Sequence, residues 1–172
     1  MKTSITLLFG LLLAGVVQAQ TGNFTPGQAA GVVKAANEAE VDTAKLAESK
    51  ATNAQVKEFA QKMVKEHGEN IQKGKDIAHK AGVKAEDSEA SKALQAEATT
   101  LKTELNNAKG AEFDKAYMQS QVDMHRKLLG DLDQKLIPAA KDPHFKEFLE
   151  TTRTHVQKHL TQAEKIQASL NK

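Results

Sequence analysis

The sequence LETTRTHVQKHLTQAEKIQASL, residues 149–170, repeats its core-facing positions every three or four residues without a break. The steps alternate three, four, three, four, which is the seam of a helix that packs in a bundle. We expect this helix to begin at Pro143, behind an Asp142 N-cap, and to run to about Leu170. Its core-facing positions are Leu149, Thr152, Val156, His159, Ala163, Ile166 and Leu170.

Three other long segments show the same helical period. They run from about Gln28 to Lys50, from a capping box at Thr52 and Gln55 to about Ala81, and from about Ala111 to Ile137. No alternating run of β-branched residues follows the first apolar segment, so strands are not expected. The sequence therefore predicts an all-α fold of four long helices.

A long connection, residues 83–110, separates the second and third long helices. It predicts a shorter amphipathic helix that starts near Glu86-Asp87-Ser88 and ends near Ala108-Lys109-Gly110. A connection of this length lets the third long helix start at the end where the first turn lies. That is the ferritin-like version of a four-helix bundle, and a simple up-down bundle with a lid helix is the alternative. The apolar face of the additional short helix is Leu94, Ala98, Leu101 and Leu105.

The first residues have the pattern of a secretory signal peptide, with cleavage expected after Ala19. Its apolar run is too short to span a bilayer, so we expect no transmembrane segment after cleavage. The expected organisation is a signal peptide (1–19), a flexible N-terminus (20–27) and one bundle domain (28–172). We expect a periplasmic or secreted protein.

Composition excludes several classes of function. The 24 basic and 22 acidic residues are interspersed and nearly balance, which gives no footprint for nucleic acid. Cysteine is absent, so the chain has neither a disulfide nor a thiolate ligand. Glycine-rich phosphate loops and the Gly-x-Ser-x-Gly elbow of hydrolases are absent too. We therefore do not expect an enzyme, although the sequence leaves that question open.

Each long helix carries one ionisable residue where the period calls for an apolar side chain. A buried ionisable group is costly unless it is paired, hydrogen-bonded or bound to a metal. All four fall near mid-helix, within about one to two turns of each other in height. Three imidazoles and a carboxylate suit Zn²⁺, Fe²⁺, Mn²⁺ or Cu²⁺, whereas a hydrogen-bonded network without metal is the alternative. The four candidates are Glu40, His67, His125 and His159, with Tyr117, Gln121 and Asp123 as possible outer partners.

A di-iron centre is disfavoured. Di-iron bundles carry Glu-x-x-His on two helices, but valine stands three residues before each core histidine, at Val64, Val122 and Val156. We expect at most one metal ion. The other histidines, His79, His144 and His155, fall near helix ends or at the edge of a stripe.

Several segments resemble an exported bacterial family known as domain of unknown function 4142. The resemblance covers nearly the whole mature chain, and its most specific part is Phe113-Asp114-Lys115-Ala116-Tyr117 with the following His125. It implies a ferritin-like helical domain in the bacterial envelope and no established activity. Arg153-Thr154 stands where this family usually has Leu-Pro. The other matching segments are Glu40-Val41 with Leu46-Ala47, Val56–Ala60, Met63–His67, Gln121-Val122, and His159-Leu160 with Ala163.

Two functions remain after this resemblance. The first is a non-catalytic, stress-related or interaction protein of the envelope, with residues 83–110 as its partner surface. The second is a bundle that binds one transition-metal ion for sequestration or redox chemistry. The sequence favours the first slightly, because a fold does not set a function. Association with membrane surfaces is disfavoured, because the charge is near neutral and tryptophan is absent.

Overall fold

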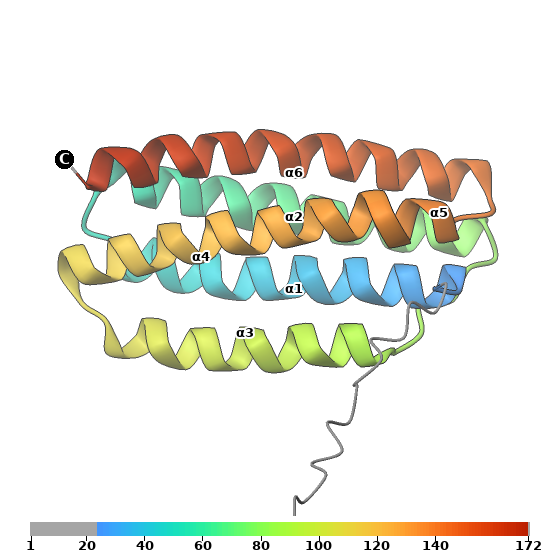
Figure 1. Ribbon diagram of the computed structural model, residues 1–172, viewed down its shortest axis with the longest axis horizontal. Helices are drawn as coiled ribbons and strands as arrows, with labels where there is room; N and C mark the ends of the chain where they lie inside the picture. The colour runs from blue at the N-terminus through green and yellow to red at the C-terminus, as the bar shows by residue number, and fades with distance from the viewer. Residues whose placement is uncertain (1–23, 172) are drawn as a thin grey trace, which may run out of the picture.

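The computed structural model describes residues 24–171, so the expected signal peptide lies outside the described residues. Four long helices form an antiparallel bundle, and a fifth lies against its outside (Figure 1). No strand occurs in residues 24–171, which confirms the all-α fold. The helices are α1 (Pro26–Lys50), α2 (Ala54–Lys80), α3 (Glu89–Asn107), α4 (Gly110–Asp131) and α6 (Pro143–Leu170), with a π-helical turn η1 (Leu132–Leu136) and a short α5 (Ile137–Ala139) after α4.

The connection between α2 and α4 crosses the length of the bundle. Figure 1 shows α3 returning along α1, so that α4 starts at the end where the α1–α2 turn lies. Asp114 near the start of α4 fixes this arrangement. Its carboxylate accepts hydrogen bonds from the backbone N–H and hydroxyl of Thr52 and from the backbone N–H of Asn53. Helices α2 and α4 therefore run in the same direction, which is the crossover topology rather than the simple up-down one.

The apolar core is divided into two clusters by a polar layer at mid-height. One cluster includes Phe59 and Phe113 and lies toward the α1–α2 turn, whereas the other includes Phe145 and Leu149 and lies toward the opposite end. Every long helix of the bundle passes from one cluster to the other through a buried polar residue. These residues are Glu40 on α1, His67 on α2, His125 on α4 and His159 on α6.

Two helix starts differ from the expected ones. Helix α1 begins at Pro26, because Thr25 forms a capping box with Gln28, so the last residues of the expected flexible N-terminus are helical. The N-cap of α2 is Asn53 rather than Thr52. The hydroxyl of Thr52 donates instead to Asp114, and the side chain of Asn53 accepts from the first backbone N–H groups of the helix.

The third long helix continues slightly past its expected end. The backbone N–H of Ile137 donates to the carbonyl of Leu132, five residues back, which is the π-helical pattern. Pro138 then lies in α5, which ends one residue later at Ala139. As expected, α6 begins at Pro143 behind an Asp142 cap, and α3 has Ser88 as its cap. No helix in residues 24–171 has the length and apolarity to cross a membrane.

Candidate metal centre

Three of the four predicted residues meet at the bundle axis. His67 from α2, His125 from α4 and His159 from α6 are all buried. Their ring centroids form a near-equilateral triangle with sides of 5.2, 5.4 and 5.6 Å. One possible ligand atom from each residue lies within 4.8 Å of the other two. The helical period predicted that these three side chains face the core, and in the folded bundle they lie at the same height.

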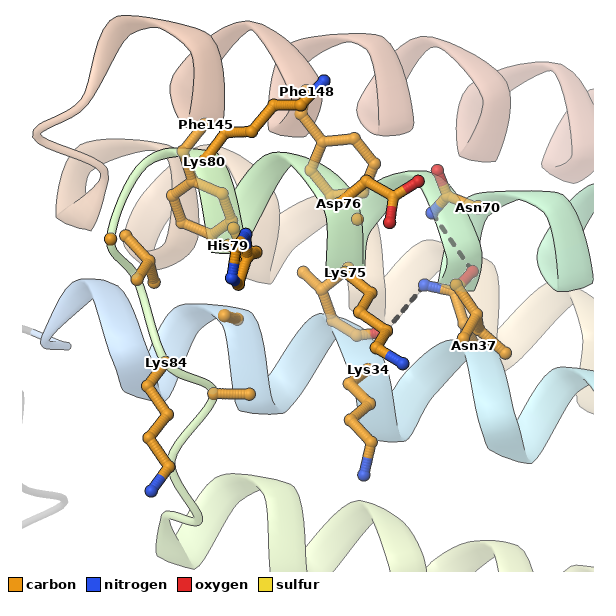
Figure 2. A pocket seen from close by; sticks show the side chains of 18 residues that line it. Lys34, Asn37, Asn70, Lys75, Asp76, His79, Lys80, Lys84, Phe145 and Phe148 are labelled. Atoms are coloured by element: carbon orange, nitrogen blue, oxygen red, sulfur yellow. Dashed lines mark hydrogen bonds between the residues drawn. The ribbon is translucent and has the colours of Figure 1, made fainter.

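His67 is oriented by an asparagine from the neighbouring helix. Its Nδ1 lies 2.8 Å from Oδ1 of Asn37. The amide nitrogen of Asn37 donates to the backbone carbonyl of Val33, and Asn70 donates to the same Asn37 Oδ1 (Figure 2). Because Oδ1 only accepts, Nδ1 of His67 carries the ring proton.

The other two histidines are oriented in the same way. Nδ1 of His125 donates to the backbone carbonyl of Gln121 at 2.8 Å. Nε2 of His159 donates to Oε2 of Glu66, on α2, at 2.6 Å. Each ring therefore directs its N–H outward, toward an oxygen at the edge of the site.

The second nitrogen of each ring has no hydrogen-bond partner. These atoms are Nε2 of His67, Nε2 of His125 and Nδ1 of His159. A neutral imidazole with one N–H already bonded offers a free lone pair on the other nitrogen. All buried side-chain nitrogen and oxygen atoms that lack a partner in residues 24–171 belong to this site and its neighbours. Buried polar atoms without a hydrogen-bond partner are rare in folded proteins, so a group of them usually has a structural or functional reason.

Burial keeps two of the imidazoles neutral near pH 7. It lowers the pKa of His159 from 6.5 to about 4, although the hydrogen bond to Glu66 acts in the opposite direction. Burial, with the proximity of His125 and His159, also holds the pKa of His67 well below its usual value. Burial alone would raise the pKa of Glu66, but its bond to His159 lowers the net value. The result is an ionised Glu66 that accepts from a neutral His159, and metal ligation requires neutral imidazole.

Glu40, the fourth residue of the predicted set, lies next to His125 but is not grouped with the ligand atoms of the three histidines. Its Oε1 lies 3.6 Å from Nδ1 of His125, on the side of the ring that already donates to Gln121. Its other oxygen is buried without a partner. Burial raises the pKa of Glu40, while the nearby His125 acts to lower it. Glu40 therefore occupies an outer position beside the cluster.

The three residues predicted as outer partners differ in their burial and in their contacts with the cluster. Tyr117 is buried, its hydroxyl has no partner, and burial with the nearby Glu40 raises its pKa well above 10. Gln121 is buried and contributes its backbone carbonyl, not its amide, to His125. Asp123 is exposed and accepts a hydrogen bond from Gln119 on the surface, so it is not an outer partner of the cluster.

Sequence reasoning missed the two side chains that orient histidines. Asn37 sits one turn before Glu40 on the buried face of α1, so its place in an alanine-rich stripe was a usable signal. Glu66 lies beside the stripe of α2 and reaches His159 through its length, which periodicity does not reveal. His79, His144 and His155 are all exposed, as their positions at helix ends and at a stripe edge indicated.

A large cavity begins next to this site and runs away from it. It has a volume of about 810 Å³ and lies along α1 and α2, with Phe145 and Phe148 of α6 in its lining (Figure 2). Asn37 and Asn70 form its polar end. Asn37 is thus the link between the cavity and His67.

The chain belongs to the family described as "Domain of unknown function (DUF4142)", whose model matches residues 14–166. No curated protein shows significant sequence similarity to it. Among solved structures, the fold is similar to one described as "CopM in the Cu(II)-bound form". The TM-score is 0.65 at 14% sequence identity, over 86% of this chain and 99% of that chain. At this identity the similarity concerns the fold alone.

Proposed function

We propose that this protein binds one transition-metal ion through His67, His125 and His159. The observation that carries the proposal is that three buried ring nitrogens, one from each histidine, face no hydrogen-bond partner. Each opposite nitrogen donates to a carbonyl or carboxylate oxygen. This is the arrangement in which proteins hold metal-binding histidines, because the outer hydrogen bond fixes the ring and its tautomer.

The size of the site fits one ion. Imidazole nitrogens bind Zn²⁺ at about 2.0–2.1 Å, which places two ligands of a tetrahedral ion roughly 3.4 Å apart. The three candidate atoms lie within 4.8 Å of one another, so small rotations of the rings close the site. Three protein ligands leave a fourth position open. An open position suits an ion that is exchanged or changes oxidation state, which agrees with sequestration or redox chemistry.

Copper is the first ion to test. Sites made of imidazoles bind Cu²⁺ more tightly than the other divalent ions of the first transition row. The structure with similar fold holds Cu(II) by its description, which supports this choice without identifying the ion here. We propose the bacterial envelope as the place of action, on the basis of the signal-peptide pattern in residues 1–19.

Elemental analysis of the untagged protein, purified from the periplasm without chelators, tests the proposal. We expect about one transition-metal ion per chain, and its loss in the His67→Ala/His125→Ala variant. The matched control, His79→Ala/His144→Ala, removes two exposed histidines and should keep the ion. Electron paramagnetic resonance of the Cu²⁺ form should show coupling to nitrogen in wild type and control alone.

Equal loss of metal in the control would refute the assignment of the ion to His67, His125 and His159. A wild-type protein that takes up neither Cu²⁺ nor Zn²⁺ after reconstitution would refute metal binding. The alternative, an envelope protein that acts through its surface, would then be the better hypothesis. In that case α3 would be the surface to test, because only Ser91 and Leu105 of its residues are buried.

A further inference from the structure

Two surface grooves, on different sides of the bundle, reach the polar layer that contains the cluster: one is lined by His159 itself and the other by Glu40. The first runs along α2 and α6, and both Glu66 and His159 line it. The second runs between α1, α3 and α4, and Glu40 lines it. The cavity that ends at Asn37 is lined by four lysines and one carboxylate, which disfavours a cation, so the charges of the two grooves decide which is the easier route.

The groove along α2 and α6 is unfavourable for a cation. Its two carboxylates, Glu66 and Glu69, are outnumbered by four lysines. One ammonium group lies 4.0 Å from Oε1 of Glu66, and Oε2 of the same residue is bonded to His159. The lysines are Lys62, Lys65, Lys73 and Lys158.

The groove between α1, α3 and α4 is acidic. It has a volume of about 210 Å³, and four carboxylates face a single lysine in its lining. Two carboxylates are neutralised, because Glu97 pairs with Lys127 at 2.6 Å and Asp131 pairs with Lys135 at 2.6 Å. Asp123 accepts only from a neutral amide, that of Gln119, and among the described residues it forms no ion pair. The negative charge of Asp123, an exposed residue of the groove, is therefore not neutralised by an ion pair.

Glu40 connects this acidic groove with the cluster. Its side chain is only 4% exposed, and its Oε2 has no hydrogen-bond partner. Its Oε1 lies 3.6 Å from Nδ1 of His125, the N–H side of that ring, so an ion held by Glu40 passes the edge of the ring to reach the free Nε2. A buried carboxylate with a free oxygen, beside both a groove and an imidazole, is placed to hold a metal cation briefly between solvent and the final ligands.

Helix α3 covers the groove and is the element that can open it. Leu94 and Leu101 of α3 line the groove, and α3 packs mainly against α1 and to a lesser extent against α4. Of its 19 residues only Ser91 and Leu105 are buried. Elements with few buried side chains open locally at a lower free-energy cost than the core, so among the long helices α3 is the one whose outward movement disturbs the bundle least.

We propose that the groove between α1, α3 and α4 is the entrance for the metal cation. Asp123 attracts the hydrated ion, and Glu40 takes it up and transfers it to the histidines. The inference rests on the proposed metal site, and it assigns to Asp123 and Glu40 a role in loading.

Stopped-flow uptake of Co²⁺ by the metal-free full chain tests the entrance, with the visible absorption of bound Co²⁺ as the signal. A divalent ion and a single charge about 10 Å apart interact in water strongly enough to change an encounter rate about fourfold. Asp123→Asn should therefore load about fourfold more slowly at low salt, and Asp123→Lys more slowly still. Both should reach the wild-type final absorbance, and the differences should shrink as salt screens the charge.

Glu69→Gln is the matched control, because it removes one carboxylate from the other groove. It should load at the wild-type rate. If wild type binds Co²⁺ but Asp123→Asn loads at the wild-type rate, the proposed entrance is refuted, whereas the proposed metal site is not affected. Slower loading in Glu69→Gln instead would assign the entrance to the groove along α2 and α6. If wild type binds no Co²⁺, the metal site itself fails and the entrance falls with it.

Discussion

Acid should destabilise the metal-free protein, because buried imidazoles resist protonation. Burial lowers the pKa of His159 from 6.5 to about 4. As the pH falls below 6.5, the unfolded chain takes up a proton that the folded chain refuses until about pH 4. Proton uptake thus favours the unfolded state, and stability falls with falling pH over that window.

The magnitude follows from the difference in pKa. A pH of 5 is about 1.5 units below the pKa of His159 in the unfolded chain, so the residue is protonated there, whereas in the folded chain it remains neutral. At about 1.36 kcal/mol per unit, this costs about 2 kcal/mol relative to neutral pH. His67 has a lowered pKa too and adds to the loss in the same direction.

Urea unfolding followed by far-UV circular dichroism at pH 7 and pH 5, with a chelator present, measures this loss. With a slope of about 2 kcal/mol per molar urea, the midpoint should fall by about 1 M. His159→Gln should reduce this pH dependence, and His144→Gln, at an exposed position, should leave it unchanged. A midpoint at pH 5 equal to or above that at pH 7 would refute the reasoning, as would loss of the dependence in His144→Gln.

Three further predictions concern packing, topology and metal linkage. Gly74→Ala places a methyl group 2.8 Å from the ring of Phe148 and should cost about 1–3 kcal/mol in urea unfolding, whereas Gly68→Ala, with open space around it, should gain up to about 1 kcal/mol. Asp114→Asn weakens the contacts that join α4 to the α1–α2 turn and should cost about 1.5–3 kcal/mol by the same assay, with Asp123→Asn as the neutral control. Zn²⁺ at 100 times its dissociation constant should stabilise wild type by about 2.7 kcal/mol in thermal unfolding and leave the double histidine variant unchanged.

The helical period predicted most of the fold because it reports directly which face of a helix is buried. It placed three histidines on the core side and gave α3 and α6 nearly their observed bounds. It could not choose between Thr52 and Asn53 as the cap of α2, because both are capping residues. A contact with Asp114, about 60 residues away in sequence, decides that choice.

The predicted site was less complete, for reasons specific to each residue. Asp123 is two residues from both Gln121 and His125, and residues two apart on a helix do not share a face. The period alone was therefore enough to exclude it. Glu40 was placed correctly in the core, but the rotation of α1 that turns it to the outer side of His125 depends on packing. Glu66 depends on the reach of a long side chain between helices, which no pattern in one helix records.

The directions of the hydrogen bonds separate the two interpretations of the polar layer. A structural network of three neutral imidazoles would satisfy itself by N–H to N bonds between the rings. Here each N–H donates to an oxygen of Asn37, of the Gln121 carbonyl or of Glu66, and the opposite nitrogen of each ring has no partner. An unpaired buried polar atom costs about 1–3 kcal/mol, so this arrangement lowers the stability of the metal-free chain. Mutual hydrogen bonds would avoid that cost, whereas coordination of one cation uses all three lone pairs together. The geometry therefore favours a binding site over a purely structural network.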